Sequence, residues 1–363
     1  MGLARWFEPL TRLWRPDAAA APALAPAASS PPLPTSAPPA DAPTATTATP
    51  ASAEATPPLA AVEVPTPIRN VRFLRWMIGV PASAAERPPA EAIVEQMFVQ
   101  LDEVIASESA RAGLLPRAPH VVPQLMKTLR DEGYSSADVA DRISKDVVLT
   151  AEVVRNATRI LQREDDGSDI DLGRAVAVVG TQGLRRAIAN VVLRPIFDAR
   201  GDSLSARAAT QIWKDADRKA RLGAAIAGEA GLDPFDGYLA GLLHNSGWTA
   251  ALRAIDLQDL GIEAIDLAHP DVVPQLVRRR DALFGALVGP WNLGAAIEGL
   301  AAEVGSVGLE RVAAPLSIAL READRLAALR ALAAPGQRPA SVVPGWATLP
   351  KAVRECFAGM GTA

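Results

Sequence analysis

The sequence has few of the residues that build secreted, disulfide-linked or β-rich proteins. Cys356 is the only cysteine among 363 residues, which excludes an intramolecular disulfide framework and fits a reducing compartment. Aromatic residues make up 4% and hydrophobic residues 49%, with alanine and leucine dominant, and this balance favours helices over strands. There is no apolar run of the roughly 18 residues that a membrane span needs, and no secretory signal. We therefore expect a cytoplasmic protein.

Strong charge and histidine are also scarce. The net charge is −4, so composition does not indicate a nucleic-acid-binding protein, and we expect no nucleic-acid partner. The three histidines are His120, His244 and His269. His120 begins a predicted helix and His269 lies in a connector, so only His244 stands in a context that suggests a functional site.

The first 67 residues divide into two segments. Residues 1–16 have an amphipathic pattern that predicts a helix ended by Pro16. Its apolar face is a candidate docking surface formed by Trp6, Phe7, Leu10 and Trp14. Three partners remain open: the protein's own core, a groove on another protein, or a membrane surface contacted peripherally. Residues 17–67 are rich in alanine, proline and threonine and predict a disordered linker.

The remainder predicts an all-α protein in three parts. Residues 68–112 form a helical extension, 113–332 a multi-helix domain, and 333–363 a connector with a short terminal helix. Expected helices in the domain include 171–179, 181–199, 203–230, 234–245, 249–255, 272–288, 293–304 and 309–332. No strand-like alternation of useful length occurs.

The stretch Leu242–Trp248 reads Leu-Leu-His-Asn-Ser-Gly-Trp. It resembles the Leu-Leu-His-Asp-Ile-Gly core of HD-type metal-dependent phosphohydrolases, with Asn245 in place of the metal-binding aspartate. A neutral amide is a weaker metal ligand than a carboxylate. Either a divergent hydrolase site survives here, or only its scaffold does.

Several stretches in order extend the resemblance to about Gly113–Leu329. They include Leu115–Leu125, Val139–Ala151, Leu172–Gly180, Ile212–Asp215 and Phe284–Leu293. Together they resemble the HDOD family, whose helical HD-related output domains occur in bacterial signalling proteins. The resemblance implies a largely non-catalytic domain with an HD-type helical subdomain.

The resemblance also implies that most metal positions are lost. Asp215 stands where an HD enzyme has its first histidine, and Asp281 where a later histidine is expected. With His244 and Asn245 these positions make a poor site for a transition metal, and at most a weak one for Mg²⁺ or Ca²⁺. We therefore expect no catalytic residues, no bound metal and no cofactor.

Two arginine groups are candidate contacts for an anion or a partner. Arg185 and Arg186 follow a turn that opens a helix, and Arg278, Arg279 and Arg280 are consecutive. A solvated helix face is the alternative for the second group. The expected function is a non-catalytic signalling or scaffolding protein that binds a signalling partner protein and, as a further candidate ligand, a nucleotide second messenger. The alternative is a divergent metal-dependent phosphohydrolase or phosphodiesterase that uses Asp215, His244 and Asp281.

Overall fold

The structure is a computed structural model that describes residues 63–84, 88–115, 151, 153–154, 172–199 and 201–361. Within these ranges every regular element is a helix, so the predicted all-α fold is confirmed. None of the described helices is long and apolar enough to cross a membrane. The predictions for the docking helix 1–16, for the linker up to residue 62 and for the stretches between residues 116 and 150 lie outside the described residues.

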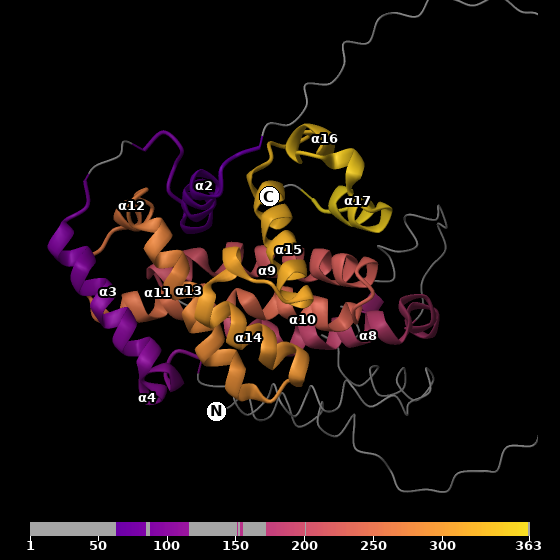
Figure 1. Cartoon of the computed structure of the whole chain (residues 1–363), viewed down its shortest axis with the longest axis horizontal. Helices are drawn as coiled ribbons and strands as arrows, with labels where there is room; N and C mark the ends of the chain where they lie inside the picture. Colours follow the sequence, from indigo (N-terminus) through magenta and orange to yellow (C-terminus); the bar gives the residue numbers. More distant parts are fainter. Residues whose placement is uncertain are drawn as a thin grey trace, which may run out of the picture.

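The described chain forms a series of helices that Figure 1 colours along the sequence. The α-helices are α2 (Thr66–Ile78), α3 (Glu91–Ala106), α4 (Glu108–Ala112), α8 (Leu172–Phe197), α9 (Leu204–Glu229), α10 (Pro234–His244), α11 (Ser246–Gln258), α12 (Ala264–Leu267), α13 (Val273–Val288), α14 (Ala295–Val307), α15 (Pro315–Leu332), α16 (Pro339–Val342) and α17 (Lys351–Ala358). Short 3₁₀ turns are η1 (Gly289–Trp291), η2 (Leu309–Arg311) and η3 (Trp346–Thr348).

Helix α9 lies at the centre and packs against α8, α10, α11, α15, α17 and α2. Hydrogen bonds to two side chains fix the N-terminus of α9. The Ser203 side chain accepts a hydrogen bond from the Ala206 amide at 3.2 Å, a standard helix cap. The Asp256 carboxylate of α11 accepts from the amides of Leu204 and Ser205 at 2.9 and 3.0 Å. These bonds satisfy amides that a helix start leaves unpaired, and they tie α11 to α9.

Helices α9 and α10 approach each other closely because glycines line their contact. A Cβ at Gly223 would lie 2.3 Å from the carbonyl oxygen of Gly237, and one at Gly241 would lie 2.4 Å from that of Lys219. No side chain fits between backbones this close. The contact therefore brings Lys219 of α9 beside the C-terminal end of α10, where His244 lies.

Of two expected helix boundaries, one is present and the other differs. The predicted break between helices 171–179 and 181–199 is present, because Gly180 has φ 63° and ψ 178° within α8. The single helix expected over 309–332 is instead η2 followed by α15, which has Pro315 in its first turn. Proline lacks the amide that would continue a helix from before it, so the chain restarts there.

Most of the buried residues form one large core, and a smaller one lies under the C-terminal helices. In the smaller core Phe357 of α17 packs with Trp346, with ring centroids 5.5 Å apart. Figure 1 places α3 and α4 along the edge opposite α17, and α2 between α12 and α15. Helix α2 thus rests on the domain through buried Phe73, Leu74 and Met77.

Gly223→Ala should lower the free energy of unfolding by about 1–3 kcal/mol, because the new methyl group meets the Gly237 backbone. Gly228→Ala on the same helix is the matched control. A Cβ there would lie 3.4 Å from Pro234 Cγ, an ordinary contact, and alanine should stabilise the helix by about 0.5–1 kcal/mol. Urea denaturation of both variants measures the difference, and equal effects would contradict the close-contact account.

Candidate functional site

The HD-like stretch lies at the junction of two helices in the interior. His244 ends α10, Ser246 begins α11, and Asn245 between them is fully buried. Asp215 and Lys219, one turn apart on α9, are also fully buried and face the same point. Buried charges are costly unless they are paired and hydrogen-bonded, so their partners decide what this site can do.

The Lys219 ammonium is the central group of the site. Its Nζ lies 2.6 Å from Asp324 Oδ1, 2.7 Å from Asn245 Oδ1 and 3.1 Å from His244 Nδ1. Asp215 Oδ2 is slightly farther, at 3.4 Å. An ammonium has three N–H donors and no acceptor. Its three protons are therefore directed at Asp324, Asn245 and His244, while Asp215 adds a second negative charge.

Asn245 uses both ends of its amide. Its Oδ1 accepts from Lys219, and its Nδ2 donates to the Ile212 carbonyl oxygen and to Asp215 Oδ2, both at 2.9 Å. An aspartate at position 245 could not donate a hydrogen bond to the Ile212 carbonyl oxygen or to Asp215 Oδ2. It would also place a second carboxylate against that of Asp215. The surroundings of residue 245 are thus built for an amide.

His244 is held as a neutral imidazole with a defined tautomer. Its Nδ1 accepts from Lys219, so its Nε2 carries the proton and donates to Asp281 Oδ1 at 3.2 Å. Burial, and then the positive charges of Arg280 and Lys219, lower the pKa of His244 to about 4 against the weaker pull of Asp281. The ring also meets Phe284 edge-on, with centroids 5.2 Å apart.

A further ion pair borders this group. Arg280 Nε lies 2.8 Å from Asp281 Oδ1, and its guanidinium stacks over Trp248 at 5.2 Å. Asp281 Oδ2 accepts from the Leu309 amide at 2.9 Å. Burial alone would raise the pKa of Asp324, but attraction from Lys219 and Arg280 outweighs it, so the pKa of Asp324 lies below its usual range.

We call this set of side chains the Lys219 cluster. Its members are Asp215, Lys219, His244, Asn245, Arg280, Asp281 and Asp324. At neutral pH it holds three carboxylates, two cations and a neutral imidazole. Its positive centre is a side chain of the protein itself.

The family model for the HDOD domain matches residues 115–302, which is more than half of the chain.

The chain belongs to the HDOD family.

Solved structures similar to this HDOD protein come from two bacteria. An HDOD domain protein of unknown function from Geobacter sulfurreducens is 22% identical, with a TM-score of 0.46, over 74% of this chain and 90% of that one. A protein from Shewanella amazonensis, provisionally assigned as a metal-dependent phosphohydrolase, is 16% identical, with a TM-score of 0.48, over 66% of this chain and 83% of that one. Comparison with curated proteins finds no significant match.

The residues at the HD positions do not fit a divalent metal. The atoms here that could coordinate a metal, on His244, Asn245 and Asp324, already face the Lys219 ammonium. The positive charge of Lys219 would repel a second cation at this point. Asp215 Oδ1 is a buried oxygen without a hydrogen-bond partner among the described residues, but a single free oxygen is no ligand set. Across the described ranges no group of three or more histidine, cysteine, aspartate or glutamate side chains is placed to hold a metal ion.

The structure brings all four predicted HD positions together. Asp215 contacts Asn245, and His244 contacts Asp281, although these residues come from three helices and a junction. Sequence reasoning missed Lys219 and Asp324. Lys219 had a signal, since it follows Asp215 by four residues and so shares its helix face. Asp324 had none, because charged Arg321, Glu322 and Arg325 surround it in the sequence.

The predicted arginine groups are divided between the interior and the surface. Arg280 and Arg185 are 4% and 7% exposed, so little of either side chain reaches solvent. Arg279 binds the Asp102 carboxylate of α3 through two nitrogens at 2.6 and 2.9 Å and covers the Phe98 ring. Arg186 stacks over Tyr238 at 5.7 Å, and Arg278 is exposed.

Lys219→Met should lower the free energy of unfolding by about 3–5 kcal/mol, because it leaves the buried Asp215 carboxylate without its lysine partner and removes the nearest cation from the partly buried Asp324. Lys214→Met, an exposed position on the same helix, should change it by less than about 0.5 kcal/mol. Chemical denaturation of the two variants at pH 7 measures both values. A loss below 1 kcal/mol for Lys219→Met would show that the ammonium is not the centre of the cluster.

The neutral His244 should make stability fall with acid. A histidine in an unfolded chain has a pKa of about 6.5, whereas burial lowers the pKa of His244 in the folded protein to about 4. Between these values the unfolded chain binds a proton that the folded chain does not, so stability decreases as pH decreases. From pH 7 to 4.5 the wild type should lose about 2–3 kcal/mol more than His244→Gln. Urea denaturation at the two pH values tests this, and equal losses would contradict a buried neutral imidazole.

Proposed function

We propose that this HDOD protein is a non-catalytic signalling or scaffolding module that binds a partner protein. The observation that carries the proposal is the position of Lys219. Its ammonium is bound by the imidazole and amide of the HD-like pair and by two carboxylates. A lysine in this place provides a positive charge but no coordination site, so it cannot activate a water molecule as a divalent metal does.

The hydrogen bonds of the cluster support the same proposal. A general base or a metal ligand needs a free lone pair directed at its target. His244 has both ring nitrogens engaged, and Asn245 has both ends of its amide engaged. His244 and Asn245 are also fully buried. The hydrogen bonds and ion pairs of the Lys219 cluster hold α9, α10, α13 and α15 in fixed positions relative to one another.

A folded helical domain without an active site acts through its surface. Membership of a family of output domains supports a role in signal transduction. We infer that the kept HD scaffold serves recognition, and that the buried ion pairs give it one defined arrangement of helices. Such a role for buried ionic groups is known in other proteins.

The proposal predicts that the full-length protein does not turn over phosphate esters. With Mn²⁺ or Mg²⁺ added, hydrolysis of bis(p-nitrophenyl) phosphate, p-nitrophenyl phosphate and cyclic dinucleotides should stay at the rate without protein. Elemental analysis of protein purified without chelator should show no stoichiometric Mn, Fe or Zn. Metal-dependent turnover that is lost in His244→Ala would instead establish the divergent phosphohydrolase that uses Asp215, His244 and Asp281.

A further inference from the structure

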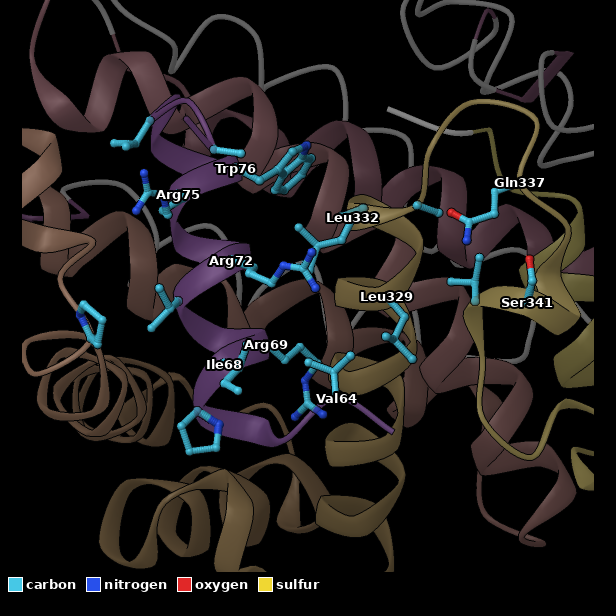
Figure 2. A pocket seen from close by; sticks show the side chains of 18 residues that line it. Val64, Ile68, Arg69, Arg72, Arg75, Trp76, Leu329, Leu332, Gln337 and Ser341 are labelled. Carbon is cyan, nitrogen blue, oxygen red and sulfur yellow. The ribbon is translucent and has the colours of Figure 1, made fainter. Parts of the chain in front are cut away.

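A large groove lies between α2 and the C-terminal helices. Its volume is about 1100 Å³, and 18 residues line it, most of them from α2, the end of α15 and the chain around α16. Figure 2 shows Arg72 reaching from α2 across the groove toward Leu332. The Lys219 cluster lies elsewhere, since none of its members lines the groove.

Among the described residues, the charged side chains that line the groove all have one sign. Arg69, Arg72 and Arg75 line it, and none of the described lining residues is an aspartate or glutamate. Spacing of three residues places these arginines along one side of α2. A surface of this kind attracts negatively charged partners and repels positive ones.

The three arginines differ in how far they are already used. Arg75 Nη2 donates to the carbonyl oxygens of Pro81 and Ala84 at 2.8 and 2.9 Å, so it closes the loop after α2. Arg69 is 5% exposed and pairs with Glu310 at 3.5 Å, but its buried Nε has no hydrogen-bond partner among the described residues. Arg72 is exposed and makes no ion pair or hydrogen bond with the described part of the chain. Arg72 is therefore the charge most available to a ligand.

The rest of the groove is apolar and firmly held. Thirteen of the 18 lining residues carry apolar side chains, and Ile68 at the rim is 52% exposed. Trp76 in the wall is fixed from two sides, by Phe73 at 5.5 Å and by the Arg218 guanidinium at 5.7 Å. A preformed apolar surface lowers the entropy cost of binding.

The size, apolar lining and positive charge of the groove favour one kind of ligand over others. The groove is somewhat larger than the roughly 300–1,000 Å³ of small-ligand pockets, and it is mainly apolar, which disfavours a compact anion alone. An apolar floor beside the exposed Arg72 guanidinium matches an amphipathic helix with an acidic face. The chain's own segment 1–16 has three arginines and one glutamate, so the groove would repel it.

We propose that the groove between α2 and α15 binds an acidic amphipathic segment of the partner protein. This inference rests on the proposed partner-binding function and names the surface and the chemistry of the partner. The segment places its apolar side chains against Ile68, Leu329 and Leu332, and its carboxylates beside Arg72.

Fluorescence anisotropy with the full-length protein tests the groove. The probe is a labelled helical peptide of about 14 residues with leucine at every third or fourth position and glutamate on the remaining face. The control peptide has lysine in place of each glutamate. The acidic peptide should bind, with an affinity that falls as salt rises, and the basic peptide should not.

Three variants locate the binding. Arg72→Glu should weaken binding of the acidic peptide about tenfold or more by reversing the available charge. Ile68→Ser should weaken it about threefold by removing exposed apolar surface. Arg207→Glu, an exposed arginine at the start of α9, is the matched control and should change it by less than about twofold. Circular dichroism and thermal melts check that all three variants fold.

Any one of four outcomes would overturn the proposal that the groove binds an acidic segment. These outcomes are no binding of the acidic peptide, equal binding of both peptides, equal effects of Arg72→Glu and Arg207→Glu, or displacement of the peptide by a cyclic dinucleotide at equal concentration. None of them measures turnover, so they leave the proposed non-catalytic function standing. Failure of that function appears separately, as metal-dependent hydrolysis.

Discussion

The hydrogen bonds of the Lys219 ammonium are the interaction on which the interior of this protein depends. Asp324, Asn245 and His244 each take one of its donors, and Asp215 adds charge. These groups come from α9, α15 and the junction between α10 and α11, so one cation joins three parts of the domain. A buried ion network of this kind has a large desolvation cost, which its hydrogen bonds offset only if all of them form.

The helix packing makes this arrangement possible. Gly223, Gly237 and Gly241 let the backbones of α9 and α10 come into direct contact. This contact fixes the position of Lys219 along α9 relative to His244 at the end of α10. Gly247 does the same between α11 and α13, where a Cβ would lie 2.3 Å from the Arg280 carbonyl oxygen. The polar groups therefore meet because small residues bring their helices together. The recognition surface proposed for α2 is built on top of this rigid centre.

The helical fold and the HD-related site were predictable from sequence because both depend on local patterns. Periodic apolar residues mark the helices, and the Leu242–Trp248 stretch marks the site and its missing aspartate. The role of Asn245 was not predictable, since it depends on the Ile212 carbonyl and on Asp215, which lie 33 and 30 residues away. Asp324 and the groove beside α2 arise from contacts between distant helices, and no local spacing encodes them. Asn245 reads as a lost ligand in the sequence, whereas in the structure it is the acceptor and donor that the lysine-centred network requires.

The most direct test of the account is an anomalous difference map from crystals of the full-length protein grown with excess Mn²⁺. If Lys219 is the centre of the cluster, the map shows no manganese peak between Asp215, His244 and Asp324, and electron density for the Lys219 ammonium lies at their centre. A manganese peak at that point, with the Lys219 side chain displaced from it, would show that the HD-like scaffold still binds metal and would contradict the central claim.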